Sequence, residues 1–232
     1  MKQQDRIPHD RPASPADMAM PAPHPLHDLR FRTLLQRAEW ETLPRAIRRR
    51  FSKRLKAGDS VVYCGEIVET RMTRYGRILA TALRVIGAPL PLDRNNADAA
   101  TVVTVTEETT GNGQIWTRHY SRRKGFPQVI HSAKRFRGPT GLEECIGHGI
   151  VMSLTLQTEP GRLLFFSHQY FFTLLGRRIA LPKALCPGRL IVGHRELGDG
   201  RFEYTLDLRH PYLGQLVFQR ATYHDMTEAG YD

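Results

Sequence analysis

From about residue 100 onward, apolar and polar side chains alternate along the chain with a period of two. The alternation breaks at short segments rich in glycine, asparagine and proline, such as 111–113 and 198–200, whose composition is typical of turns. Strands at this spacing, joined by tight turns, indicate an antiparallel meander. The strands expected from this pattern cover residues 101–106, 114–120, 128–136, 143–158, 162–174, 189–196, 202–208 and 215–224.

The strand expected over residues 143–158 has the most regular alternation. Ile146, His148 and Met152 fall on its apolar face, while small or polar residues such as Ser153 fall on the other. One buried and one solvated face are typical of an antiparallel sheet. We therefore expect His148 to point toward the interior of the protein.

Before residue 100 the apolar residues recur mainly at helical spacing. The pattern predicts helices over residues 28–56, beginning at Asp28 as N-cap and interrupted at Pro44, and over residues 73–86. Gly58 is expected to end the first helical region. A strand is expected between the two helical regions, over residues 60–70.

About nine strands from one meander seldom form a flat sheet, because curvature or closure removes exposed edges. The expected fold is therefore mainly β (α+β): a curved antiparallel meander or barrel, lipocalin-like, with the N-terminal helices covering one face or opening. Residues 28–232 are expected to form this single domain. Residues 1–27 contain six prolines and few residues that could pack, so we expect a disordered tail there.

Composition narrows the class of protein. The chain has 232 residues, is 41% hydrophobic and carries a formal net charge of +11. Its three cysteines form no CxxC pair, and it has neither a secretory signal pattern nor an apolar run long enough to span a membrane. We therefore expect a cytoplasmic protein.

The positive charge is concentrated in three acid-free segments, residues 43–57, 71–92 and 109–142. Such a basic face would suit an anionic membrane surface or, less well, a nucleic acid, since the sequence patterns of the common nucleic-acid-binding folds are absent. An ordinary solvated basic surface explains the same pattern.

Candidate chemistry is concentrated on two of the predicted strands. Trp116, Arg118 and Tyr120 share one face of a strand, and Glu144 lies on the face we expect to be inward. If both faces point inward, Arg118 and Glu144 could pair inside the barrel, since a buried charge needs a partner. Arg118 could then receive an acidic ligand between Trp116 and Tyr120. The alternatives are an ion pair at the barrel rim or an Arg118 that faces solvent.

Catalytic signatures are weak. His148 could serve as a ligand residue or a general acid or base, although a lone histidine on an apolar face is usually a hydrogen-bonded core residue. Ser167 precedes His168 directly, and consecutive strand side chains point to opposite faces, which is evidence against a catalytic pair of these two residues. A pair of Ser167 with His148 or His194 is geometrically possible. The sequence contains no nucleophile elbow, nucleotide-binding loop or zinc motif. We expect no metal and no cofactor.

Several short motifs, in order along the chain, are similar to those of a known family. They are residues 116–120 (WTRHY), residues 141–147 (GLEECIG), Ser167 with Tyr170, Leu181-Pro182, Pro187-Gly188, and His210-Pro211 with Gly214. Together they resemble a bacterial family of domains of unknown function, numbered 4166, over roughly residues 30–224. The resemblance implies no particular reaction. Some members are fused to dehydrogenase- or epimerase-like modules, which implies a link to metabolism.

Three hypotheses follow. The first is an intracellular binding module whose barrel cavity holds a small, largely apolar or acidic ligand. The second is an enzyme that uses the same cavity, with Glu144 or His148 as general acid or base. The third is a peripheral protein that binds an anionic membrane or a nucleic acid through its basic face. The candidate ligand-binding residues are Trp116, Arg118, Tyr120, Glu144, His148, Ser167 and Tyr170.

Overall fold

The alternating segments form antiparallel strands of one large sheet. The computed structural model describes residues 26–56, 58–85, 90–93, 96–122, 125–175 and 177–226. The strands of the sheet are β3 (Ser60–Met72), β4 (Ala100–Glu108), β5 (Gly113–Tyr120), β6 (Gln128–Arg135), β7 (Glu143–Gly147), β8 (Ile150–Glu159), β9 (Arg162–Leu174), β10 (Arg177–Ala180), β11 (Arg189–Gly198), β12 (Arg201–His210) and β13 (Gly214–Asp225).

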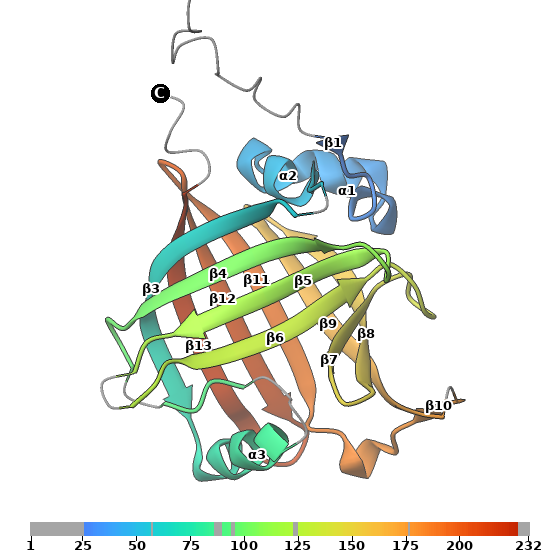
Figure 1. Cartoon of the computed structure of the whole chain (residues 1–232), viewed down its shortest axis with the longest axis vertical. Helices are drawn as coiled ribbons and strands as arrows, with labels where there is room; N and C mark the ends of the chain where they lie inside the picture. The colour runs from blue at the N-terminus through green and yellow to red at the C-terminus, as the bar shows by residue number, and fades with distance from the viewer. Residues whose placement is uncertain are drawn as a thin grey trace, which may run out of the picture.

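The sheet closes on itself into a barrel (Figure 1). Its strand order is β10-β9-β11-β12-β13-β3-β4-β5-β6-β7-β8, and β8 also pairs with β9, so ten strands form a continuous wall and β10 extends one end of β9. β3 and β13, the first and last strands of the wall, are antiparallel neighbours, with Met72 opposite Val217 and Tyr63 opposite Asp225. The predicted lipocalin-like antiparallel barrel is confirmed.

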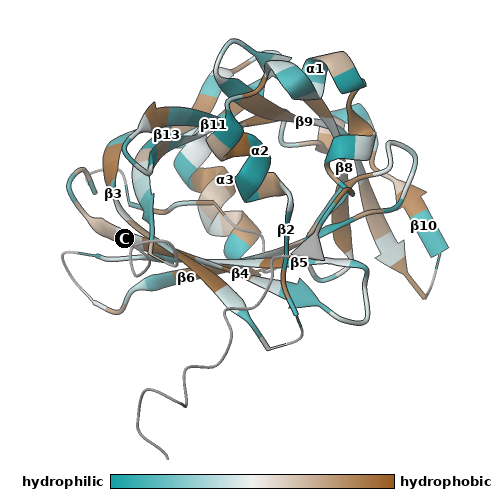
Figure 2. Ribbon diagram, turned by 90° about the horizontal axis from the view of Figure 1, so that it is seen from above, coloured by the Kyte–Doolittle hydropathy of each residue, from teal (hydrophilic) through white to brown (hydrophobic). Residues whose placement is uncertain are grey.

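Short helices lie at both ends of the barrel. α1 (Arg37–Thr42) and α2 (Arg45–Phe51) lie over the mouth at the top of Figure 1, and α3 (Arg74–Val85) lies at the opposite end. Figure 2, which looks down on the upper mouth, shows α2 over the opening. No helix among the described residues is both long and apolar enough to cross a bilayer. The remaining short elements are η2 (Arg32–Leu34), η3 (Lys183–Leu185), and the paired strands β1 (Leu26–His27) and β2 (Lys53–Arg54).

Phe31 anchors the N-terminal segment in the upper mouth. Its side chain is fully buried, and its ring makes edge-to-face contacts with Phe51 of α2, Phe136 and Phe165 of β9, at centroid distances of 5.2, 4.8 and 6.1 Å. Aromatic pairs in this geometry add to the stabilisation that burial alone provides. The upper end of the barrel is therefore closed by a packed aromatic cluster.

The continuous helix expected from Asp28 is wrong. The Asp28 carboxylate accepts a hydrogen bond from the backbone N–H of Arg30 (2.9 Å) and pairs with its guanidinium, so it holds a local turn. Leu35 is extended, and α1 begins only after Gln36. Gln36 and Glu39 form a capping box, in which each side chain meets the other residue's backbone N–H.

The second helix is also shorter than expected. α2 ends at Phe51, and Ser52 turns the chain into β2, which pairs with β1. Gly58 therefore lies beyond β2 rather than at a helix end. Of the predicted tail, residues 1–25 lie outside the described residues, and the last two form β1. The single-domain assignment of residues 28–232 stays a prediction.

α3 confirms the predicted helix, and its small residues face the barrel. Gly76 and Ala80 are buried, whereas Ile78 is 66% exposed. A Cβ atom at Gly76 would collide with the backbone oxygen of Leu216, so the missing side chain lets the helix approach β13. Residues 86–89, where we expected the helix to stop, lie outside the described residues.

The long strand expected over residues 143–158 is wrong. The chain reverses at His148 and Gly149, and Gly147 pairs with Ile150 across a two-residue hairpin turn. Both turn residues have positive φ, 45° for His148 and 79° for Gly149, as a type I′ turn requires. His148 is consequently exposed at the tip of the β7–β8 hairpin and does not face the barrel interior.

Candidate functional site

Alternate residues of β5, β6 and β7 point into the barrel. β5 contributes Trp116, Arg118 and Tyr120, as the period-two pattern predicts, and all three are buried. Lys134 of β6 and Glu144 of β7 are directly opposite each other in the sheet and are 2% and 5% exposed. The strands therefore bring two cations and one carboxylate together inside the lumen.

Arg118, Lys134 and Glu144, here called the charge triad, form one connected group. Lys134 Nζ lies 3.2 Å from Glu144 Oε2, and Arg118 Nη2 lies 3.7 Å from Glu144 Oε1. Arg118 Nη1 also donates a hydrogen bond of 3.1 Å to Ser132 Oγ. With all three groups ionised, the charge triad carries one net positive charge.

The surroundings of the charge triad shift the pKa of each member. Burial acts to raise the pKa of Glu144, but Lys134 and Arg118 outweigh it, so this pKa lies below its usual range. Burial lowers the pKa of Lys134, which Glu144 counteracts only in part. Burial acts to lower the pKa of Arg118 as well, but Tyr204 and Glu144 raise it above its ordinary value. Arg118 is therefore the permanent cation of the group.

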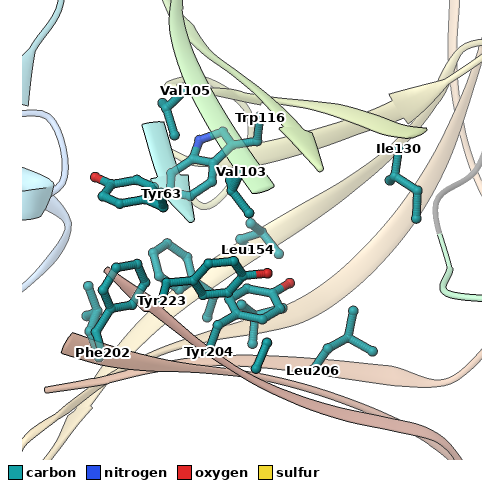
Figure 3. Close-up of a cluster of buried hydrophobic side chains, with 14 of the residues drawn as sticks. Tyr63, Val103, Val105, Trp116, Ile130, Leu154, Phe202, Tyr204, Leu206 and Tyr223 are labelled. Carbon is teal, nitrogen blue, oxygen red and sulfur yellow. The ribbon is translucent and has the colours of Figure 1, made fainter. Parts of the chain in front are cut away.

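Aromatic rings surround the cations. Lys134 Nζ lies 5.0 Å from the ring centroid of Trp116 and 5.6 Å from that of Phe165, within cation–π range. The guanidinium carbon of Arg118 lies 5.9 Å from the ring of Tyr204. In Figure 3, the labelled residues Trp116 and Val105 lie on one wall of the lumen, and Phe202, Tyr204 and Tyr223 lie on the opposite wall.

Three buried tyrosines supply neutral hydroxyl groups near the charge triad. Burial raises the pKa of Tyr120, Tyr204 and Tyr223 above the ordinary value, so all three stay protonated at neutral pH. The hydroxyl of Tyr223 lies 3.2 Å from that of Thr101, and that contact satisfies it. The lumen thus contains neutral tyrosine hydroxyl groups, and Glu144 remains the anionic member of the group around Arg118 and Lys134.

A cavity of about 60 Å³ adjoins the charge triad on the side toward α3. Two of its lining residues are charged, Arg118 and Glu144, and three are tyrosines, Tyr120, Tyr170 and Tyr204. The other lining residues are Leu83, Leu90, Ile130, Ile146, Met152, Pro187, Leu190, Val192, Leu206 and Leu208. Sites for drug-sized ligands usually measure about 300–1,000 Å³. Most of the lumen is therefore filled by side chains, and the remaining space fits only a few heavy atoms.

His194 lies deep in the lumen above the charge triad. Its ring is 2% exposed and packs edge-on against Phe51 (5.0 Å) and Trp116 (6.1 Å). Burial, together with Arg50 and Lys134, holds its pKa well below 6.5, and its Nδ1 has no hydrogen-bond partner among the described residues. His194 is therefore a neutral core residue.

Main-chain pairing joins β9 and β11 along only part of their length. Their main-chain pairing ends at Phe166, and Ser167 Oγ accepts a hydrogen bond of 2.8 Å from the backbone N–H of Leu190. Tyr170 then donates from its hydroxyl to the backbone oxygen of Gly188 (3.0 Å). Burial raises the pKa of Tyr170 to about 12, so this donor keeps its proton. Two side chains thus bridge the β9–β11 seam, defined by residues 167–170 and 188–190.

Sequence comparison places this barrel in a family. A family model described as Domain of unknown function (DUF4166) matches residues 43–223, which include the charge triad and the β9–β11 seam. The chain belongs to this family. No curated protein matches the sequence. Among solved structures, a mutant of the fluorescent protein UnaG is similar at 14% identity and a TM-score of 0.31, covering 72% of this chain and 95% of that one.

In the structure of this DUF4166 domain, the candidate ligand-binding residues lie in three different places. Arg118, Tyr120, Glu144 and Tyr170 line the inner cavity. Trp116 packs beside it against Lys134, and Ser167 lies in the wall. His148 lies at the exposed hairpin tip, away from the others, because the chain turns there.

Sequence reasoning missed Lys134 and His194 as parts of this lumen. Alternation along β6 puts Ile130, Ser132 and Lys134 on one face, so the signal for Lys134 was present. We counted Lys134 instead with the basic surface of residues 109–142. Only the pairing of β6 with β7 shows that Glu144 lies opposite it.

Proposed function

We propose that this domain is an intracellular binding module that holds a small, largely apolar acidic molecule in the barrel cavity. The observation that carries the proposal is the charge balance of the charge triad, in which two buried cations share one carboxylate. An excess charge in a low-dielectric interior is unfavourable by several kcal/mol (about 3–5) unless it is paired. A ligand carboxylate next to Arg118 would supply the missing negative charge.

The geometry supports Arg118 as the group that meets the acid. Arg118 lines the cavity, whereas Lys134 lies behind Glu144 and contacts Trp116 and Phe165. A guanidinium presents several N–H donors in a plane, which suits a carboxylate better than a point charge does. The apolar lining would cover the rest of the ligand. The acidic part and the apolar part of the ligand would therefore contact different groups within one cavity.

The small cavity limits the size of the ligand. A space of about 60 Å³ suits a short carboxylic acid rather than a long-chain one. We expect affinity to rise from acetate to butyrate as apolar contacts increase, by about 0.8 kcal/mol for each buried methylene group. It should fall for longer acids, which do not fit without displacing side chains.

The test compares butyrate with butyramide, its neutral counterpart of the same shape, by titration calorimetry. Butyrate should bind the wild-type protein at least about tenfold more tightly, since the amide lacks the negative charge. Lys134→Met removes the excess charge and leaves the Arg118–Glu144 pair balanced, so it should weaken butyrate binding while the protein stays folded. Arg195→Met, an exposed position on β11, is the matched control and should bind as the wild type does.

Equal affinities for butyrate and butyramide would refute the proposal. So would a Lys134→Met protein that stays folded and binds butyrate as tightly as the wild type. Native mass spectrometry of the purified protein would separately reveal any acid that is retained from the cell.

The enzyme hypothesis gains less support from the same residues. A general acid needs a pKa near the working pH, whereas Lys134 and Arg118 hold the pKa of Glu144 low. His148 lies at the exposed tip of the β7–β8 hairpin and does not line the barrel cavity. We therefore place the binding module first.

A second candidate function is attachment to an anionic membrane through α3. Tyr75, Ile78 and Val85 on this helix are 44%, 66% and 84% exposed, and arginines lie among them. Apolar and basic side chains together suit the surface of an anionic bilayer. Flotation with vesicles of phosphatidylserine and phosphatidylcholine tests this idea. Binding that is lost in Ile78→Ser supports it, and absence of binding at low salt refutes it.

A further inference from the structure

A second hollow lies on the outside of the barrel, beside the β9–β11 seam. It measures about 440 Å³, within the usual range of small-molecule sites, about 300–1,000 Å³. We call it the outer cleft and define it by Phe166, His168, Lys183, Arg189, Arg209 and His210. These residues come from β9, from η3 and the start of β11, and from the end of β12. The outer cleft thus lies where three separate segments of the chain meet.

Two cationic side chains of the outer cleft face each other across the sheet. Arg189 and Arg209 are direct cross-strand partners in the β11–β12 ladder, and both are exposed. Like charges in directly opposite positions destabilise an antiparallel sheet. Asp207 forms an ion pair of 2.8 Å with Arg209, which reduces this repulsion. Arg189 has no carboxylate partner among the described contacts.

Arg189 is instead held in place by an aromatic ring. Its guanidinium carbon lies 4.6 Å from the ring centroid of Phe166 on the neighbouring strand. This stacking fixes the plane of the guanidinium and leaves the N–H groups at its edge available to a ligand. The arrangement presents a preoriented cation at the floor of the outer cleft.

Other cleft residues add positive charge and no negative charge. Lys183 of η3 lines the outer cleft, and none of the lining residues is acidic. His168 and His210 also line it, and His210 Nδ1 accepts a hydrogen bond of 3.3 Å from the backbone N–H of Tyr212. Pro211 supplies exposed apolar surface. The cleft therefore combines several donors for an anion with an apolar contact.

We propose that the outer cleft is a separate binding site for a small phosphate monoester that carries an apolar group. A dianion would compensate Arg189 and Lys183 and relieve the Arg189–Arg209 repulsion. A guanidinium meets phosphate oxygens through two parallel hydrogen bonds, which favours a phosphate over a simple point anion. The organic part of the ligand would lie against Pro211, an exposed lining residue. Tyr170 lines both the outer cleft and the barrel cavity, but the ligand proposed here is distinct from the one proposed for the barrel cavity.

Because Arg189 and Arg209 repel each other, the Tm of a variant at Arg189 distinguishes a ligand-binding role of this residue from a structural one. Arg189→Met keeps apolar cover over Phe166 and removes one of the two facing charges. Without ligand, its Tm should equal or exceed that of the wild type, while ligand binding is lost. A residue retained for stability would behave in the opposite way, with a lower Tm on replacement.

The experiment uses phenyl phosphate as the probe and measures its binding by titration calorimetry at low salt. Phenyl phosphate should bind the wild type more tightly than benzoate, a monoanion, and more tightly than inorganic phosphate, which has no apolar part. Arg189→Met and Lys183→Met should each weaken binding at least about tenfold. Arg195→Met, on the same strand and equally exposed, is the matched control and should change affinity less than about twofold.

Four results would overturn the proposal. The first is no binding of phenyl phosphate to the wild type at low salt. The second is an equal loss in Arg189→Met and Arg195→Met, which would indicate diffuse attraction to a basic surface. The third is equal binding of inorganic phosphate and phenyl phosphate, which would show that apolar contacts contribute no affinity at this site. Loss of phenyl phosphate binding in Lys134→Met would instead place the ligand in the barrel cavity and also refute the outer site.

Discussion

Replacing Glu144 by glutamine preserves the shape of the side chain but removes the negative charge that faces Lys134 and Arg118. The N–O distances are 3.2 and 3.7 Å, so at an effective dielectric constant of about 20 each contact provides about 4–5 kcal/mol of attraction. The penalty for burying the charges offsets much of this attraction. Measured losses on removing one partner of a buried ion pair are about 3–5 kcal/mol. We expect Glu144→Gln to lower the free energy of unfolding by that amount.

Lys134→Met should be much less harmful. It leaves Arg118 and Glu144 as a balanced pair, so we expect a loss below about 1.5 kcal/mol, typical of a volume-conserving core change. The double variant Glu144→Gln/Lys134→Met should be more stable than Glu144→Gln alone, because it buries one unpaired cation instead of two. The coupling between the two changes should reach at least about 1.5 kcal/mol.

Urea unfolding followed by tryptophan fluorescence measures these differences, and its pH dependence adds a second check. Burial lowers the pKa of Lys134, so between that pKa and 10.5 the unfolded chain binds the proton that the folded protein has released. Stability therefore rises with pH in this window. Without Glu144 the pKa of Lys134 falls further, so Glu144→Gln should regain stability relative to the double variant, which lacks the lysine, as the pH rises toward 10.5.

The reasoning is refuted if Glu144→Gln lowers the free energy of unfolding by less than about 1 kcal/mol, or if the two changes are additive. Either result would mean that the charges of the triad do not interact strongly in the folded protein.

Three further predictions concern other parts of the barrel. Because burial holds the pKa of His194 well below 6.5, the free energy of unfolding should fall as pH drops below 6.5, where the unfolded chain gains a proton. His194→Leu should flatten this dependence in urea titrations, and an unchanged slope would contradict the assignment. Gly76→Ala forces a methyl group against Leu216 and should cost about 1–3 kcal/mol by denaturation, whereas Thr81→Ala on the exposed side of α3 should not. His148→Asn suits the positive φ of the hairpin turn, so Tm should not fall and butyrate binding should not change; weaker binding would show that His148 contacts the ligand.

The barrel could be predicted from the sequence because half-buried strands leave a local signal. The alternation of apolar and polar residues over 114–120 is a local property of the sequence, and the same alternation of buried and half-buried side chains is found in β5. The hairpin at His148 was missed because the two-residue turn does not interrupt the alternation, so Ile146, His148 and Ile150 read as one face. The glycines on both sides of His148 were the available sign that the chain could turn there.

The charge triad was only half predictable. Arg118 and Glu144 were recognised because each follows the alternation of its own strand. Lys134 was assigned to a basic surface, since lysine is almost never buried without a partner and the partner lies on another strand. The pairing of Lys134 with Glu144 depends on the register of β6 against β7, which no local pattern specifies. Two of the basic residues in segment 109–142 thus belong to the lumen, and the surface charge of that segment is correspondingly smaller.

The pairing of β3 with β13 sets the order in which the protein can fold during synthesis. Met72 and Val217, which are opposite each other, lie 145 positions apart in the chain. Contacts of such long sequence separation form slowly, because the intervening chain must first be ordered. Until β13 leaves the ribosome, β3 remains a sheet edge whose free backbone groups can pair with another chain. Synthesis of β13 therefore turns an aggregation-prone open sheet into a closed wall, and truncation within β13 should harm solubility more than loss of the N-terminal helices.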